Sequence, residues 1–283
     1  MEFVRHWIEK SGYTAALGLR LDALSESSAR LSLPYDDANS NPGKALHGGV
    51  AASLSAVGSQ AVGRAALGPD SGPWHICALQ VNYLSAAIGE AVVAEARLLR
   101  RGKEMCFVEV DVQTSGGKPI AHATSAVRGR FGAGESAPAH AAGDHGASDP
   151  GTMGPHIGSI PFVGNRGISV EHMTGGTSRL VMPFQAANGD SGGGVHEGAV
   201  LALLDTTGAM AAWAESGPGR YKASTPSIQA QLLMVPPQAD LVAYGSCVRR
   251  DREIFFSAVD VATASDAVLV ARGTVVYRIL TDI

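Results

Sequence analysis

The chain has 283 residues, of which 45% are hydrophobic and 17% charged, and its formal net charge is −4. This length is sufficient for two domains that each bury a core, and the composition is that of an ordinary soluble globular protein. The slight negative charge gives no electrostatic reason to bind nucleic acid or an anionic membrane surface.

The N-terminus, the uncharged runs and the cysteines bear on the cellular compartment. Residues 1–10 carry four charged side chains and no apolar segment follows them, so no signal peptide is predicted. The longest uncharged run, around residues 45–63, contains His, Gln, Ser and Gly, which argues against a transmembrane helix. The three cysteines lie in apolar runs without a Cys-x-x-Cys spacing, which predicts reduced, buried thiols in a cytoplasmic protein.

Residues 1–130 predict a regular order of elements. Residues 1–15 mix aromatic and charged positions as a short amphipathic helix does. Two runs then alternate apolar and polar residues as a hairpin does, and a Pro/Gly loop opens an almost charge-free helix that ends near residue 68. Strand-like runs complete the unit; with the hairpin they are 17–24, 28–34, 75–84, 90–100, 105–114 and 120–130.

Residues 131–159 break this pattern. They are mostly Gly, Ala, Pro, Ser and His without an apolar period, and we interpret them as a flexible linker. The histidines in this stretch (His140, His145, His156) have no spacing typical of metal ligands, so no metal site is predicted.

The order of elements occurs a second time, over residues 160–283. His196 stands where His47 stands, at an offset of 196 − 47 = 149 residues, and Gly18 with Gly167 and Arg30 with Arg179 keep the same offset. Chance matches do not hold one offset over nearly a hundred residues, so the chain is a tandem duplication. The small side chains of the long helix would let a curved antiparallel sheet wrap closely around it, which predicts an α+β fold.

Three motifs carry a resemblance to a known family: Leu46-His47-Gly48-Gly49-Val50, Asn82-Tyr83-Leu84-Ser85-Ala86-Ala87 and Arg100-Arg101-Gly102-Lys103. In this order, and in a duplicated chain, they resemble the hotdog-fold acyl-CoA thioesterases, specifically the phenylacetate-pathway branch. The resemblance covers residues 12–130 and 160–280. It implies two tandem hotdog units, each a curved antiparallel sheet around one long helix, which pair so that the active site lies between them.

The two copies depart from the family pattern in complementary ways. Copy one keeps Asn41 and the two glycines, but Ala56 stands nine residues after His47, where the family has an acid. Copy two has Asp205 at that position, but Glu197 replaces the first glycine. The complete set therefore occurs once, between copy one and copy two. The converse site of Ala56, His196 and Glu197 is expected to be inactive in hydrolysis, having either lost its function or been remodelled to hold another part of the ligand.

The resemblance implies a role for each member of this set. The Gly48 N–H, with the Asn41 amide as a second donor, would polarise the thioester carbonyl. Asp205 would activate water as a general base or, alternatively, attack as a nucleophile. Thr225 would help to hold the water, and His47 would shape the loop, with proton transfer as its alternative role.

Further residues are expected to bind the substrate or to support the fold. Gly49 belongs to the same corner as Gly48. Matched basic turns, for which a solvated surface is the alternative, would hold the phosphates of coenzyme A: Arg100, Arg101, Lys103, Arg249 and Arg250. Gln80 and Gln229, matched by the repeat within apolar strands, are expected to satisfy buried backbone groups.

The predicted activity is hydrolysis of an acyl-CoA thioester without a metal or redox cofactor, coenzyme A being part of the substrate. A homodimer of the tandem chain is also expected from the resemblance. Two alternatives stay open at this point: a non-catalytic protein that binds or senses acyl-CoA, and a hotdog dehydratase or hydratase. The sequence does not predict which acyl group is preferred.

Overall fold

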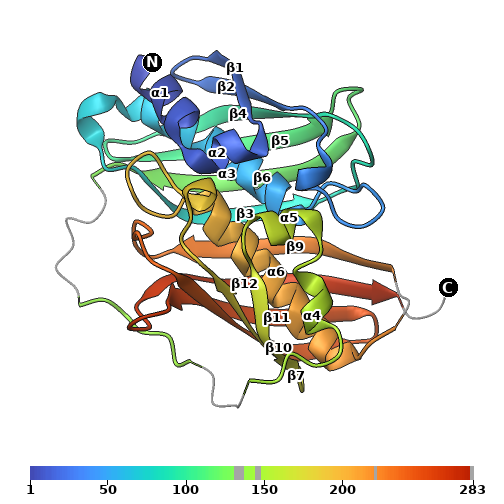
Figure 1. Ribbon diagram of the computed structural model, residues 1–283. Helices are drawn as coiled ribbons and strands as arrows, with labels where there is room; N and C mark the ends of the chain where they lie inside the picture. Colours follow the sequence, from blue (N-terminus) through green and yellow to red (C-terminus); the bar gives the residue numbers. More distant parts are fainter. Residues whose placement is uncertain (131–136, 144–147, 220–221, 281–283) are drawn as a thin grey trace.

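The computed structural model describes residues 1–130, 137–143, 148–219 and 222–280, and these form two copies of one α+β unit (Figure 1). The helices of the first copy are α1 (Glu2–Lys10), α2 (Gly12–Leu17) and α3 (Gly48–Leu67), and its strands are β1 (Arg20–Leu24), β2 (Ser28–Leu33), β3 (His75–Tyr83), β4 (Val92–Arg101), β5 (Met105–Thr114) and β6 (Pro119–Arg128). The helices of the second copy are α4 (Gly154–Ile157), α5 (Pro161–Asn165) and α6 (Glu197–Ser216), and its strands are β7 (Ser169–Thr174), β8 (Thr177–Met182), β9 (Lys222–Leu232), β10 (Leu241–Asp251), β11 (Ile254–Thr263) and β12 (Leu269–Leu280). The predicted α+β order of elements is therefore confirmed in both copies.

The described strands form one continuous twelve-stranded sheet, in the order β1-β2-β4-β5-β6-β3-β9-β12-β11-β10-β8-β7. The copies join where β3 pairs antiparallel with β9, with Gln80 opposite Gln229. Both glutamine side chains are exposed, so the prediction that they satisfy buried backbone groups is wrong. They lie at the join of the two copies, on the face of the sheet that points away from the helices.

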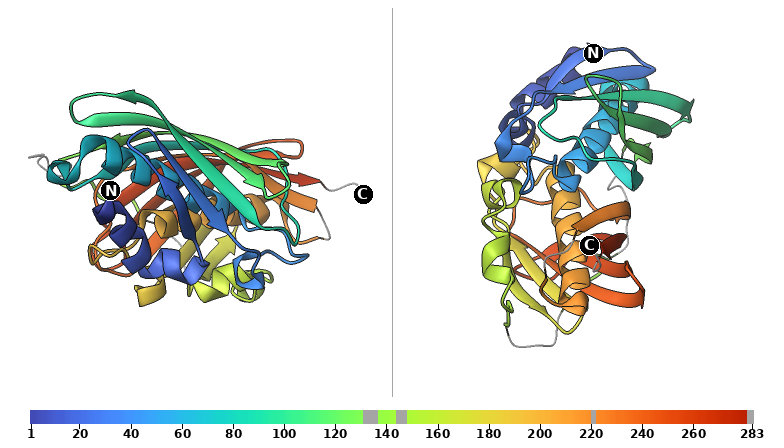
Figure 2. Two further views of the ribbon diagram at one scale, coloured as in Figure 1. Left: turned by 90° about the horizontal axis from the view of Figure 1, so that it is seen from above. Right: turned by 90° about the vertical axis from the view of Figure 1, so that its right-hand side faces the viewer.

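The long helices α3 and α6 lie together on one face of the sheet, which curves around them (Figure 2). Small side chains permit this close approach. A Cβ added to Gly63 of α3 would lie 2.7 Å from Cγ1 of Val127 on β6, so any side chain there would push helix and sheet apart. None of the described helices is long and apolar enough to cross a membrane.

The linker predicted at 131–159 is only partly a connection. Residues 131–136 and His145 lie outside the described residues, but Asp149 accepts a hydrogen bond from the N–H of Met173 (2.8 Å), and α4 packs on β7. At the offset of 149 residues, α4 and α5 correspond to α1 and α2. The prediction of a flexible linker is therefore wrong for residues 148–159, which belong to the second copy of the fold.

Candidate active site

His47 shapes the corner that begins α3. It is the N-cap residue of this helix, and its Nδ1 accepts a hydrogen bond from the N–H of Gly49 (3.0 Å). The ring is buried and packs against Phe162 of α5, with centroids 4.5 Å apart. Burial lowers the pKa of His47 to about 4, so the imidazole is neutral at pH 7 and acts as an acceptor at Nδ1. This geometry fits the expected loop-shaping role and gives no support to proton transfer.

Gly48 is the first residue of α3 and faces the other half of the chain. Its N–H makes no hydrogen bond with any other residue in the described part of the chain, as is usual for the first turn of a helix. A Cβ added to Gly48 would lie 2.8 Å from Oδ2 of Asp205, which is too close for a stable contact. A glycine is therefore what allows the Asp205 carboxylate to lie against the N-terminus of α3.

Asp205 lies in the middle of α6 and is 3% exposed. Its Oδ1 accepts a hydrogen bond from Oγ1 of Thr225, on β9, at 3.0 Å. Asp205 forms no ion pair within the described residues. Burial raises the pKa of Asp205 to about 6, although the Thr225 hydrogen bond opposes this shift. A carboxyl group with this pKa can exchange protons near neutral pH.

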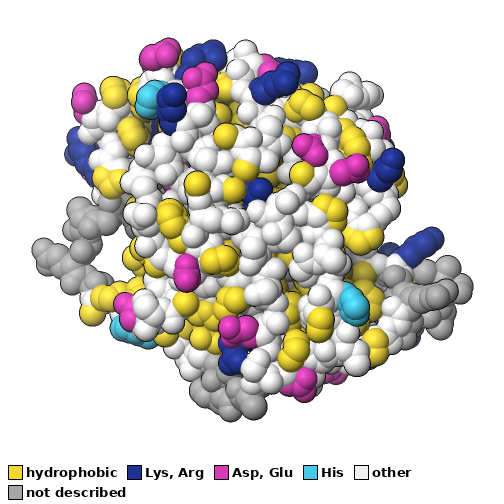
Figure 3. All heavy atoms as spheres, viewed as in Figure 1, with side chains coloured by type: hydrophobic (Ala, Val, Ile, Leu, Met, Phe, Trp, Pro, Cys, Tyr) yellow, Lys and Arg dark blue, Asp and Glu magenta, His cyan; other side chains and the backbone are white. Residues whose placement is uncertain are grey.

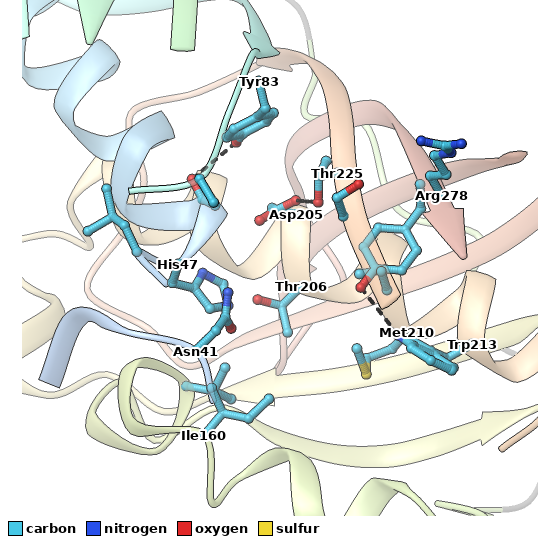
Figure 4. A pocket seen from close by; sticks show the side chains of 18 of the residues that line it. Asn41, His47, Tyr83, Ile160, Asp205, Thr206, Met210, Trp213, Thr225 and Arg278 are labelled. Carbon is cyan, nitrogen blue, oxygen red and sulfur yellow. Dashed lines mark hydrogen bonds between the residues drawn. The ribbon is translucent and has the colours of Figure 1, made fainter. Parts of the chain in front are cut away.

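A cavity of about 700 Å³ surrounds this pair (Figure 4). Five of the predicted site residues line it together: Asn41, His47, Gly48, Asp205 and Thr225. Gly49 does not line it, because it faces α6, where an added Cβ would lie 2.8 Å from the Cβ of Ala202. Gly49 therefore serves the packing of the two helices.

The predicted basic turns lie outside the cavity. The strand registers place the β4–β5 hairpin, which carries Arg100, Arg101 and Lys103, at the end of the sheet where β3 begins, whereas the cavity lies where β3 ends. Arg249 and Arg250 lie at the same end of the sheet as the cavity, where β9 begins. They belong to β10, however, which is separated from β9 by β12 and β11. The phosphate-binding role stays a prediction for Arg249 and Arg250. Within one chain, the geometry does not support this role for Arg100, Arg101 and Lys103.

The cavity also contains residues that the sequence reasoning missed. Tyr83 donates a hydrogen bond through its hydroxyl to the carbonyl of Gly48 (3.1 Å), and Arg278 lies at the rim with a side chain that is 43% exposed. Other missed lining residues are Met153, Ile157, Ile160, Val163, Thr206, Ala209, Met210, Trp213 and Tyr277. One signal was available, because Tyr83 belongs to the motif of residues 82–87 that carries the family resemblance.

The converse site is filled by side chains. Glu197, which occupies the position of Gly48, lies 2.7 Å from Nδ1 of His75 and accepts hydrogen bonds from Gln60 (2.8 Å) and from the N–H of Ile76 (3.1 Å). Burial alone would raise the pKa of Glu197, but the hydrogen bonds from His75 and Gln60 hold it below its usual value. The carboxylate therefore stays charged and has no free position from which to activate water.

Helix α1 closes the same site from outside. Trp7 stacks on His196 with centroids 5.7 Å apart and donates its indole N–H to Oδ2 of Asp190 (2.7 Å). The guanidinium of Arg64 lies 3.8 Å from the centre of the Trp7 ring. Only about 70 Å³ of cavity remains there. These contacts support the prediction that this site is inactive.

The described residues contain no group of three or more His, Cys, Asp or Glu side chains placed to hold a metal ion. That the reaction uses no metal or redox cofactor stays a prediction.

In the face shown by Figure 3, charged side chains are most frequent along the upper rim, over α1 and the strands of the first copy, and apolar or uncharged side chains make up most of the centre.

Fold and site together define a tandem hotdog protein with an open site between its two units. Comparison with known proteins adds the family. The model of the acyl-CoA thioesterase N-terminal domain matches residues 36–128. A Halobacterium salinarum protein named "Putative esterase" is 30% identical over 131 residues, which cover 45% of this chain and 86% of that protein. The chain therefore belongs to the hotdog-fold acyl-CoA thioesterases, a family of thioester hydrolases.

Solved structures show the same tandem fold over nearly the whole chain. A hot dog fold protein from Alicyclobacillus acidocaldarius has a TM-score of 0.67 at 14% identity and covers 98% of each chain. A TesB protein from Mycobacterium avium subspecies paratuberculosis has a TM-score of 0.65 at 11% identity, with 95% of this chain and 99% of that one covered. The acyl-CoA thioesterase II TesB2 of Mycobacterium marinum has a TM-score of 0.64 at 12% identity, with 96% and 97% covered. Membership of the phenylacetate-pathway branch stays a prediction.

Proposed function

We propose that this chain hydrolyses acyl-CoA thioesters to a carboxylic acid and free coenzyme A at one composite site between its two units. The observation that carries the proposal is the approach of Asp205 to Gly48. A buried carboxylate from one copy lies against the free N-terminus of a helix from the other, inside a cavity of about 700 Å³.

The N-terminus of α3 would polarise the thioester. The Gly48 N–H and the dipole of a 20-residue helix both favour negative charge at this point. Asn41 lines the same cavity, so its amide is available as a second donor. Loss of one such donor typically reduces the rate by about 10²–10³-fold.

Asp205 would supply the base. The Thr225 hydroxyl donates to Oδ1, which leaves Oδ2, the oxygen that faces Gly48, to accept a proton from water. The water oxygen then bonds to the carbonyl carbon, and the oxyanion forms beside the Gly48 N–H. When this intermediate collapses, the carbon–sulfur bond breaks and the proton held by Asp205 passes to the coenzyme A sulfur.

Arg278 is the cationic side chain best placed for a coenzyme A phosphate, because it lines the rim of the cavity and is partly exposed. Its present partner is Glu253, at 3.3 Å, and exposed pairs of this kind are weak. A phosphate group could therefore replace this carboxylate.

The test is thiol release from a panel of acyl-CoAs by the wild type and by Asp205→Asn and Asp205→Ala. We expect both substitutions to lower kcat by at least about 10³-fold, because each removes the base. Glu197→Gln, which alters the corresponding corner of the closed site, is the matched control and should retain wild-type kcat. Unchanged hydrolysis in both Asp205 variants would refute the site. Tight binding of acyl-CoA by the wild type without any turnover would favour an acyl-CoA binding or sensing protein instead.

Single-turnover hydrolysis in ¹⁸O-water separates the two roles of Asp205. A general base leaves the label in the product acid alone. A nucleophile forms an anhydride, whose hydrolysis places ¹⁸O in the Asp205 carboxylate, where mass spectrometry of the peptide would detect it.

A further inference from the structure

The cavity has an apolar arm that runs along α6 away from the reacting groups. Starting at Asp205, the next lining residues of this helix follow at steps of one, four, five and eight positions, so they share one face: Thr206, Ala209, Met210 and Trp213. Eight residues of helix advance about 12 Å, which sets the length of the arm. Figure 4 shows Met210 and Trp213 on this path, beyond Asp205 and Thr206.

The wall opposite α6 is also hydrocarbon. It comes from residues 153–163, the α4–α5 segment, which contributes Met153, Ile157, Ile160 and Val163. The Thr206 hydroxyl donates to the carbonyl of Ala202 (2.8 Å), so it is already paired within the helix. Such a surface favours an acyl chain over the polar pantetheine arm of coenzyme A.

Trp213 is the last residue of α6 that lines the cavity. Its indole N–H donates to the hydroxyl of Tyr277 at 3.3 Å, and both rings pack on a fully buried cluster of Ala212, Phe255 and Ile279. The indole is therefore held from behind, at the point where a chain that follows α6 would meet it.

The other copy shows how much this position matters. Arg64 stands there in place of Trp213, with its guanidinium over the rings of Trp7 and Trp74, at 3.8 and 5.0 Å from their centres. The space that remains in that copy is about 70 Å³, against about 700 Å³ in the open site. The side chain at this position thus lines the site in both copies.

We propose that the arm between α6 and the α4–α5 segment holds the acyl group and that Trp213 is its stop, which makes medium-chain acyl-CoAs the substrate class. This inference rests on the proposed thioesterase function. An extended chain advances about 1.25 Å per carbon, so an arm of about 12 Å accommodates about eight to ten carbons. Each methylene buried before the stop should raise kcat/KM about fourfold, and further carbons should lower it.

The experiment measures kcat/KM for straight-chain acyl-CoAs from four to sixteen carbons. Trp213→Ala should move the maximum to longer chains by about four carbons, the extent of one indole ring. Trp213→Phe, which keeps an aromatic ring, gives a smaller shift and serves if the alanine variant does not fold. Trp74→Ala is the matched control, because it removes a partly buried tryptophan at the closed site and should leave the maximum unchanged.

Calorimetry with non-hydrolysable thioether analogues of the same chain lengths gives a second readout, the dissociation constant, that does not depend on turnover. The same shift in the affinity maximum is expected for Trp213→Ala. A maximum that stays in place in both readouts would overturn the role of Trp213 while leaving the thioesterase proposal intact. A wild type that neither hydrolyses nor binds any acyl-CoA would instead overturn the proposed function, and this inference with it.

Discussion

Gly48→Ala separates the chemistry of the composite site from its stability. The added Cβ would lie 2.8 Å from Oδ2 and 3.6 Å from Cγ of Asp205, so the carboxylate must move by several tenths of an ångström. Backbone strain does not enter, because Gly48 is not among the glycines with positive φ, and the matching position of the other copy carries Glu197. The perturbation is therefore confined to the approach of Asp205 to the N-terminus of α3.

The two effects of this substitution have opposite signs for stability. Alanine in place of glycine at a helical position stabilises by about 0.5–1 kcal/mol. A shift of Asp205 that weakens its 3.0 Å hydrogen bond with Thr225 costs about as much, roughly 0.5–1.5 kcal/mol. The free energy of unfolding should thus change by less than about 1 kcal/mol. Activity should fall by about 10²-fold or more, because the methyl group occupies the place between the base and the oxyanion donor.

The assay pairs kcat/KM on one acyl-CoA with thermal unfolding of the same sample. We expect a large loss of kcat/KM with a melting temperature within a few degrees of wild type. Gly63→Ala is the contrasting control, since its added Cβ would lie 2.7 Å from Val127 in the core and should lower the melting temperature instead. If Gly48→Ala keeps kcat/KM within about threefold of wild type, the Gly48–Asp205 pair is not where the chemistry takes place.

Four further predictions concern the pH dependence of activity, the pH dependence of stability, the closed site and the rim of the open cavity. Because the base must be ionised, kcat/KM should fall as pH drops below about 6, and Thr225→Ala should move this limb to higher pH by removing the hydrogen bond that lowers the pKa of Asp205. Burial raises the pKa of Asp205 in the folded chain above its ordinary value of 3.8, so ionisation of this group costs stability as pH rises from about 4 through 6. Asp205→Asn should therefore stabilise by about 3 kcal/mol at pH 7 and by little at pH 3.5, as measured by urea unfolding. Trp7→Ala should lower the free energy of unfolding by about 3 kcal/mol or more without changing kcat, since Trp7 is buried against His196 and Arg64 and does not touch the open cavity; a loss of kcat in folded protein would contradict this. Arg278→Ala should raise KM for acyl-CoA several-fold with little change in kcat, and the difference should shrink at high salt; equal KM values at low salt would exclude a phosphate contact.

The sequence predicted the central pair because the duplication made two losses visible at once. Ala56 and Glu197 each remove one half of a site, and the residues that remain, Gly48 and Asp205, are those that line one cavity. The long helices and the strands were predictable for a similar reason, since their periodicity depends on local sequence alone.

Features that depend on contacts between distant segments were not predictable. Residues 148–159 look like a linker in composition, and it is the packing of α4 on β7 that shows this segment to be the counterpart of α1. Gln80 and Gln229 face outward because they alternate with buried neighbours along their strands, but no pattern within either strand announces the β3–β9 pairing that places them opposite each other. The closure of the second site likewise arises from α1, more than 180 residues from the Asp190 carboxylate to which Trp7 donates.

The closed site has a consequence for the open one. Its contacts join the two copies: Trp7 of copy one bonds to Asp190 of copy two, and Glu197 of copy two binds Gln60, His75 and the Ile76 N–H of copy one. In a dimer of identical units, a glutamate at this corner would appear in both sites and remove the catalytic glycine from each. A tandem chain is free of this constraint, because each copy has its own sequence. The corner that lost its glycine can therefore help to hold the two units together, which adds to the stability of the chain and leaves the chemistry to the open site.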